Sequence, residues 1–199
     1  MSNILTITSS EGTDALLHAL GEQLRAAGAA FDILVVGGSA LLALGLVSRA
    51  TKDVDVLAVR TDGALVSAEP LPAALVEACG RVARDFGLPP DWLNSGPAGL
   101  LDFGLPEGFV GRVEVREYGP ALTVRFASRV DQIHFKLYAA VDASTPGKHA
   151  ADLRALTPTS DELVAAARWS LTHDPSDGYR EMLERALVYF GVEDADLSV

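Results

Sequence analysis

The chain has 199 residues, of which 49 % are hydrophobic, and its formal net charge is −11. This length suffices for one ordinary domain, or for a catalytic domain with a small helical appendage. A broad nucleic-acid-binding face is disfavoured, because an acidic surface repels polyphosphates at long range. No apolar run approaches the roughly 18 residues that would span a bilayer.

The N-terminus and the cysteine content point to one compartment. No basic segment followed by an apolar stretch opens the chain, so we expect no signal peptide. The single cysteine, Cys79, cannot form an internal disulfide and lies in a helical pattern. We therefore expect a cytoplasmic protein without a membrane segment, in which Cys79 is a small buried residue.

The first part of the chain alternates predicted helices and strands. Apolar residues at helical spacing indicate a helix over 12–28, and FDILVV at 31–36 is typical of a buried strand. Two glycines end that strand, and a short apolar helix follows from Ser39, as its N-cap, to Val47. A second strand, DVDVLAVR, covers 53–60.

The middle of the chain is less regular. We expect an irregular segment over 61–72, which holds two prolines, and a helix over 73–87. Residues 89–108 are rich in Gly and Pro and predict a long loop with a helical turn, a feature that is often functional. Two alternating runs in 110–128, around Gly119-Pro120, predict a hairpin.

The last third of the chain predicts helices only. We expect four helices and one turn. The helices cover 129–142, 148–156, a stretch that starts within 157–162 and runs to about 173, and 177–190, and the turn lies at 145–147. The expected fold class is α/β (α+β), with a mixed β-sheet core flanked by helices over residues 1–128. Residues 129–199 form a C-terminal helical region that packs on this core.

Two carboxylates, Asp53 and Asp55, lie on one face of the second predicted strand. Side chains alternate along a strand, so the two acids point one way, about 6 to 7 Å apart, while Val54 and Val56 point the other way. Burying such like charges costs several kcal/mol, and a Mg²⁺ ion would neutralise them. The alternative is an exposed strand end at which both aspartates are merely solvated.

The turn before this strand favours an anion. Gly37 and Gly38 let the backbone approach a ligand closely, and the helix beginning at Ser39 directs its N–H groups beyond the turn. Arg49 and Thr51, just before the carboxylates, either bind phosphates and order the loop or are plain turn residues. Neither the dinucleotide pattern G-x-G-x-x-G nor the G-K-[ST] of phosphate-binding loops is present.

Together these residues carry a family resemblance. Gly37-Gly38-Ser39, a short helix and then Arg49-Ala-Thr51-Lys-Asp53-Val-Asp55 resemble the active-site signature of the nucleotidyltransferase superfamily of DNA polymerase β. The stretch VVGGSALLALGLVSRATKDVDVLAV is most similar to small bacterial members that include AbiEii-type and MenT-type toxins. DWLN and the later DQIHFKLYAAVD and KHAADLRALTPTSDEL resemble further elements of one bacterial branch, so the resemblance covers about residues 31–165.

The resemblance implies a metal-dependent transfer of a nucleoside monophosphate (NMP) from a nucleoside triphosphate (NTP) to an acceptor hydroxyl. It implies Mg²⁺ or Mn²⁺ on Asp53 and Asp55, and a nucleotide site made by Gly37, Gly38, Ser39, Arg49 and Thr51. The acceptor would be RNA such as a tRNA end, a protein or a small molecule, and the toxin members imply a cognate antitoxin. The alternative is an inactive relative that binds a nucleotide or a partner protein.

Some positions depart from the family pattern or have two interpretations. A third metal-binding carboxylate is usual on a later strand, and Glu114 is the best candidate, unless it is an exposed ion pair with neighbouring arginines. Lys136 lies in an apolar helical stretch, where it must snorkel or pair. The resemblance makes Lys136 a candidate catalytic residue, with Asp152 as its helical partner or as an accessory group. His149 stands where the family often has an aspartate.

Overall fold

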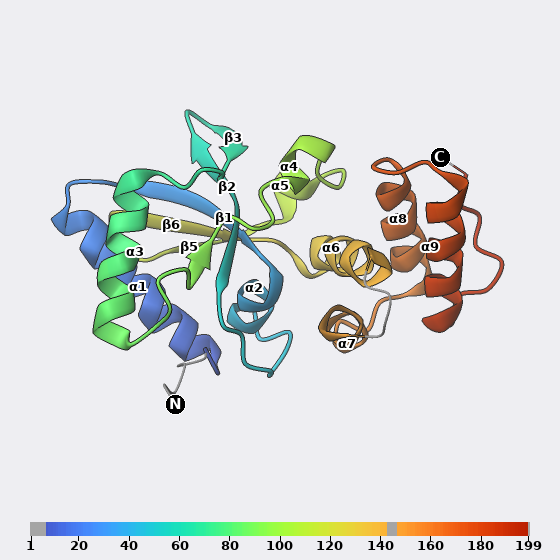
Figure 1. The fold of residues 1–199 in the computed structure, drawn as a ribbon, viewed down its shortest axis with the longest axis horizontal. Helices are drawn as coiled ribbons and strands as arrows, with labels where there is room; N and C mark the ends of the chain where they lie inside the picture. Colours follow the sequence, from blue (N-terminus) through green and yellow to red (C-terminus); the bar gives the residue numbers. More distant parts are fainter. Residues whose placement is uncertain (1–6, 143–146, 199) are drawn as a thin grey trace. The chain divides into compact units, whose positions relative to one another are not determined.

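The computed structural model describes residues 7–142 and 147–198. They form two compact units, one made of residues 7–105 and 109–127, the other of 106–108 and 128–198. The first unit holds a mixed sheet with helices, and the second is helical (Figure 1). This confirms the α+β class with a C-terminal helical segment. No helix within the described residues combines the length and apolarity needed to cross a bilayer.

The first unit contains all the strands of the described chain, interleaved with helices. The strands are β1 (Phe31–Val36), β2 (Val54–Thr61), β3 (Ala64–Ser67), β4 (Leu93–Asn94), β5 (Glu114–Glu117) and β6 (Leu122–Phe126). The helices are α1 (Ser10–Ala26), α2 (Gly37–Ala43), α3 (Ala73–Phe86), α4 (Leu100–Phe103) and α5 (Phe109–Arg112). The second unit consists of α6 (Arg129–Asp142), α7 (Lys148–Ala155), α8 (Ser160–Leu171) and α9 (Asp177–Tyr189).

The sheet has the strand order β3-β2-β1-β6-β5, and the short β4 pairs with β2. β1 runs antiparallel to β2 and parallel to β6, and β4 runs parallel to β2. The two strands with the longest apolar runs, β1 and β2, are therefore central. Their side chains on one face join the core with α1, α2 and α3, and Figure 1 shows α1 and α3 against the sheet.

The opposite face of the sheet carries polar side chains. Alternation assigns to it the residues that the core cluster leaves out, among them Asp32, Leu34, Val36, Asp55, Arg60 and Arg125. The register between β1 and β2 shifts between Leu34 and Val35, so Leu34 lies opposite Ala58 whereas Val35 lies opposite Val56. Leu57 is therefore an extra residue in β2. It reverses the alternation, so a side chain after Leu57 points to the face opposite to the one that a regular strand would give it.

The main helices and strands match the sequence predictions. The differences concern the start of α2 and the short elements β3, β4 and α4. Ser39 is not an N-cap: α2 begins at Gly37 with Val36 as its cap, so Ser39 lies in the first turn and is buried. Gly37 has a φ of 77°, which lets the chain turn at once at the strand end. The segment expected to be irregular contains β3, and the expected long loop contains β4 and α4.

Two further predictions have clear outcomes. The hairpin is confirmed as β5 and β6, but the expected first run begins with a helical turn, α5. Cys79 is buried as expected, and burial raises the pKa of its thiol to about 12. The turn expected at 145–147 lies mostly outside the described residues.

In the second unit, two ion pairs join the helices. Arg129 at the start of α6 binds Glu162 of α8 at 2.7 Å, and Glu162 also closes a capping box with Thr159. Lys136 of α6 lies 2.7 Å from the carboxylate of Asp152 of α7, with side-chain exposures of only 6 % and 1 %. Lys136 therefore pairs with Asp152, one of the two interpretations of Asp152 that the sequence analysis left open.

We predict that Lys136→Met lowers the free energy of unfolding by about 3 to 5 kcal/mol, because it leaves the buried Asp152 carboxylate without this cation. The double variant Lys136→Met/Asp152→Leu should recover most of that loss, since both charges are gone. Urea unfolding measures both values, and Lys148→Met, at an exposed lysine of α7, is the control. A single variant as stable as the wild type would contradict the buried pair.

Candidate functional site

The junction of β1 and α2 lies against the carboxylate of Asp55. Val36 is opposite Asp55 in the sheet, so the next residue, Gly37, reaches the acid at the strand end. A Cβ atom at Gly37 would lie 2.5 Å from Asp55 Oδ2, and the φ of 77° also disfavours any side chain. Glycine is thus required twice at this position, once for the backbone turn and once for the approach of the acid.

Gly38 is enclosed from the other side by the segment before β2. A Cβ atom there would lie 3.0 Å from Thr51 Oγ1 and 3.2 Å from Arg49 Nη2. Thr51 is buried, and its backbone pairs in both directions with Ile7. The Thr51 hydroxyl donates to Asp53 Oδ1 at 3.3 Å. Arg49, Thr51 and Asp55 therefore lie against the glycine turn, and Asp53 is joined to it through the hydroxyl of Thr51.

Ser39 adds an unsatisfied polar atom beside this turn. Its side chain is fully buried, and its Oγ atom has no hydrogen-bond partner within the described part of the chain. Buried hydroxyls are normally hydrogen-bonded, because leaving one unpaired costs about 1 to 3 kcal/mol. Ser39 follows Gly38 directly in the chain, so this hydroxyl without a partner lies in the first turn of α2.

Asn94 is a site residue that the sequence analysis did not identify. It lies directly opposite Asp55 in the β4–β2 pair, and its Nδ2 donates to Asp55 Oδ1 at 3.2 Å. Its Oδ1 accepts from the backbone N–H of Gly96 at 2.8 Å. A backbone N–H can only donate, so this bond orients the amide and turns its NH₂ group to the acid.

The DWLN segment holds Asn94 in place through its other residues. Trp92 is buried, and its indole N–H donates to the carbonyl of Cys79 at 3.1 Å. The N–H of Val54 donates to the carbonyl of Trp92, and Leu93 is buried in the core. Trp92 is thus a core residue that anchors β4, and the anchor positions Asn94 beside Asp55.

The structure does not bring Glu114 to the two aspartates. β5 is separated from β2 by β6 and β1, which corresponds to about 14 Å at the usual strand spacing. Glu114 is exposed and forms an ion pair with Arg116 at 2.7 Å, the alternative that the sequence left open. The side chain that contacts Asp55 from β4 is the neutral Asn94.

Lys136 belongs to the second unit, whereas the residues around Gly37 all belong to the first. A role for Lys136 toward a nucleotide stays a prediction. Its observed partner is Asp152.

The donor set around the glycine turn suits a hard divalent cation that arrives with a ligand. No cluster of three or more His, Cys, Asp or Glu side chains that could hold a metal occurs in the described residues. Mg²⁺ is commonly bound by one or two carboxylates, with water and substrate phosphates completing its shell. Asp53 and Asp55 fit this pattern, whereas the space that side chains at Gly37 and Gly38 would fill is occupied by Asp55, Thr51 and Arg49.

Comparisons with known protein families, with curated proteins and with solved structures find no match to this chain.

We predict that Asn94→Asp creates a divalent-cation site with three carboxylates. The new carboxylate faces Asp55 Oδ1, so in chelator the free energy of unfolding should fall by about 1 to 4 kcal/mol through like-charge repulsion. Added Mn²⁺ should restore the stability, with a larger rise in melting temperature than in the wild type. Differential scanning fluorimetry with and without Mn²⁺ measures this.

Asn94→Ala is the matched control, because it removes the amide without adding a charge. It should lose only the two hydrogen bonds of the amide, about 1 to 2 kcal/mol with or without Mn²⁺, and should show no enlarged response to Mn²⁺. An Asn94→Asp variant that behaves like the wild type under both conditions would show that residue 94 does not face the carboxylate site.

Proposed function

We propose that the protein is a nucleotidyltransferase that moves an NMP from an NTP to an acceptor hydroxyl. The observation that carries this proposal is the position of the Asp55 carboxylate, which touches the place where a Cβ of Gly37 would be. A carboxylate and a turn without side chains thus lie face to face, and the resemblance in sequence spans these same residues.

The residues of the glycine turn would hold the phosphates of the nucleotide. Gly37 is half-buried and Gly38 is buried, and neither adds a side chain at this position. The hydroxyl of Ser39, which has no partner among the described residues, would donate to a phosphate oxygen. Arg49, whose guanidinium lies against Gly38, adds a positive charge to this position. Asp53 and Asp55 would hold Mg²⁺ or Mn²⁺, which supplies charge compensation for the phosphates and lowers the pKa of the acceptor hydroxyl.

The reaction is an in-line displacement at the α-phosphorus. The acceptor oxygen forms a new bond to this phosphorus, while the bond from phosphorus to the β-phosphate oxygen breaks. Pyrophosphate leaves with the electron pair of that bond, and the proton of the acceptor hydroxyl passes to solvent. The protein contributes positioning and charge compensation, which account for most of the catalysis in phosphoryl-transfer enzymes.

An inactive relative of the same fold is the second candidate. The neutral Asn94 next to Asp55 favours it, because the superfamily usually has a third carboxylate. Such a protein would bind an NTP at the glycine turn without transferring the NMP. The enzyme is favoured because both aspartates of the resembled signature are present and because position 37 requires a glycine.

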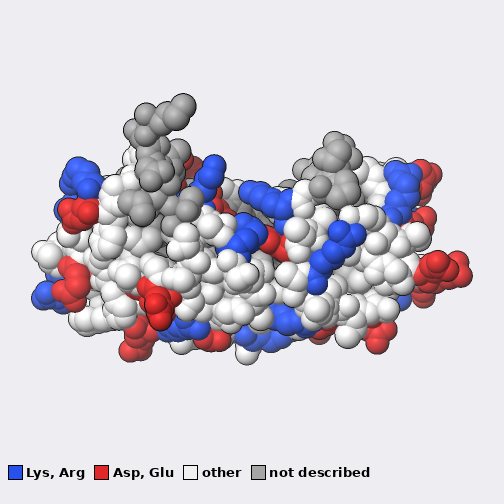
Figure 2. All heavy atoms as spheres, turned by 90° about the horizontal axis from the view of Figure 1, so that it is seen from below, with Lys and Arg blue, Asp and Glu red and all other residues white. Residues whose placement is uncertain are grey.

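The charges of the described residues favour a small molecule or a protein as acceptor over RNA. Three arginines in or directly after the hairpin in the sequence are paired with acids: Arg116 with Glu114, Arg125 with Asp32, and Arg129 with Glu162. Both acidic and basic side chains are visible on the face drawn in Figure 2. With a net charge of −11, the chain offers little attraction to a polyanion. A toxin role with a cognate antitoxin rests on the resemblance alone.

The transfer is tested with each α-³²P-labelled NTP and Mg²⁺, offered with a low-molecular-weight cell extract, with total tRNA, and with neither. We expect a labelled product with one of these acceptors. Asp55→Asn should lower the rate about 100-fold or more, since it removes a charge that faces the phosphates. Asp85→Asn, at an exposed acid of α3, is the matched control and should keep the rate.

Transfer that survives in Asp55→Asn would contradict the assignment of the site. NTP binding that depends on Asp55, with no labelled product from any acceptor, would identify the inactive relative instead.

A further inference from the structure

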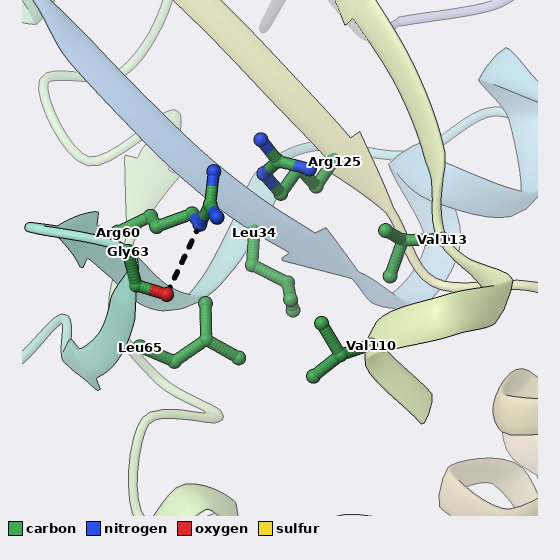
Figure 3. Close-up of a pocket in the computed structure, with 7 residues that line it drawn as sticks. All are labelled: Leu34, Arg60, Gly63, Leu65, Val110, Val113 and Arg125. Carbon is green, nitrogen blue, oxygen red and sulfur yellow. Dashed lines mark hydrogen bonds between the residues drawn. The ribbon is translucent and has the colours of Figure 1, made fainter. Parts of the chain in front are cut away.

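A pocket of about 220 Å³ opens in the first unit on the sheet face that carries Asp55. Its walls are aliphatic, from Leu34, Leu65, Val110 and Val113, and two cations, Arg60 and Arg125, complete the lining. In Figure 3 the two guanidinium groups lie at one side of the pocket, and Leu65 and Val110 lie at the other. The pocket thus has an apolar part and a cationic part.

The register shift in β2 places this pocket and the carboxylate on one face. Asp55 and Arg60 are five residues apart, an odd separation that would put them on opposite faces of a regular strand. The shift at Leu57 adds one residue to β2, so Arg60 follows Ala58 onto the face of Leu34 and Asp55. A bulge that re-aims a side chain in this way is typical of strands next to functional sites.

The pocket begins within the reach of a small molecule from Asp55. Val36 lies opposite Asp55, and Leu34 is two residues back along β1. This spacing corresponds to about 7 Å along the strand and about 5 Å across to the next strand, hence about 8 Å between the two side-chain positions. A molecule seated on Leu34 could therefore extend a hydroxyl to the carboxylate site.

The cationic part of the pocket has one positive charge in excess. Arg125 binds Asp32 through two hydrogen bonds of 2.8 Å each, and Arg60 approaches the same carboxylate at 3.7 Å. The Nε of Arg60 donates to the carbonyl of Gly63 at 3.3 Å, which fixes the guanidinium at the pocket rim. Two guanidinium groups thus share one carboxylate, and a guanidinium is a preferred partner for a carboxylate or phosphate ligand.

We propose that this pocket binds the acceptor, and that the acceptor is a small molecule with a ring-sized apolar body and one anionic group. The ring fills the space between Leu34, Leu65, Val110 and Val113, and the anion, a carboxylate or a phosphate, binds Arg60. A volume of about 220 Å³ admits one ring rather than a larger ligand. The assignment as acceptor site rests on the proposed nucleotidyltransferase function.

The test uses benzoate, phenyl phosphate and benzyl alcohol as probes of the pocket. In methyl-labelled wild-type protein, benzoate or phenyl phosphate should shift the methyl resonances of the four aliphatic residues, and whichever binds more tightly identifies the anion. The affinity of the neutral benzyl alcohol should be lower than that of the anionic probe by about 10-fold or more. Arg60→Gln should weaken the anionic probe about 10-fold, whereas Arg84→Gln, at an exposed arginine of α3, should not.

Three results would overturn the proposal: equal binding of benzyl alcohol, unchanged affinity in a folded Arg60→Gln variant, or no shift at the pocket methyls with either anion. If neither anion binds the pocket but NMP transfer still depends on Asp55, the proposed nucleotidyltransferase function holds and the acceptor site is wrong. If an anion binds the pocket but the protein transfers no NMP to any acceptor, the proposed function is contradicted instead.

Discussion

The contact between the Asp55 carboxylate and the side-chain-free backbone of Gly37 is the constraint around which the site is arranged. It requires β1 and β2 to lie side by side in the register that sets Val36 opposite Asp55. It also requires a left-handed glycine, with a φ of 77°, at the end of β1. Thr51 and Asn94 then close the site from two sides, so that Asp53 and Asp55 have defined positions.

The sequence predicted the centre of this arrangement because its signals are strong and local. β1 and β2 are long apolar runs, and two acids in such a run stand out against the alternation of the strand. Asn94 could not be predicted, because a strand of two residues has no periodicity. Its pairing with β2, about 40 residues earlier in the chain, depends on the burial of the neighbouring Trp92. The position of Glu114 on a later predicted strand makes it a candidate, but the strand order, which the sequence does not reveal, separates it from Asp55.

The other differences have equally specific causes. β3 is an exposed edge strand in which no residue is fully buried, so its apolar alternation is weak. Ser39 resembles an N-cap only if the helix begins after the glycines, whereas Gly37 itself begins the helix. The helices of the second unit were predictable from their own signals, such as the capping box of Thr159 and Glu162. The partner of Lys136 followed from the need to neutralise a buried cation, but its role in catalysis does not follow from that pairing.

The central claim is that Asp55 and the glycine turn together bind a cation and the phosphates of a nucleotide. Its most direct test is a crystal structure with Mn²⁺ and a non-hydrolysable NTP, in which anomalous scattering locates the ion. The account predicts an ion at about 2.1 Å from Asp55 Oδ2, the distance usual for Mg²⁺, with phosphate oxygens against Gly37 and Gly38. A nucleotide bound elsewhere, or bound at the turn with no ion on either aspartate, would contradict it.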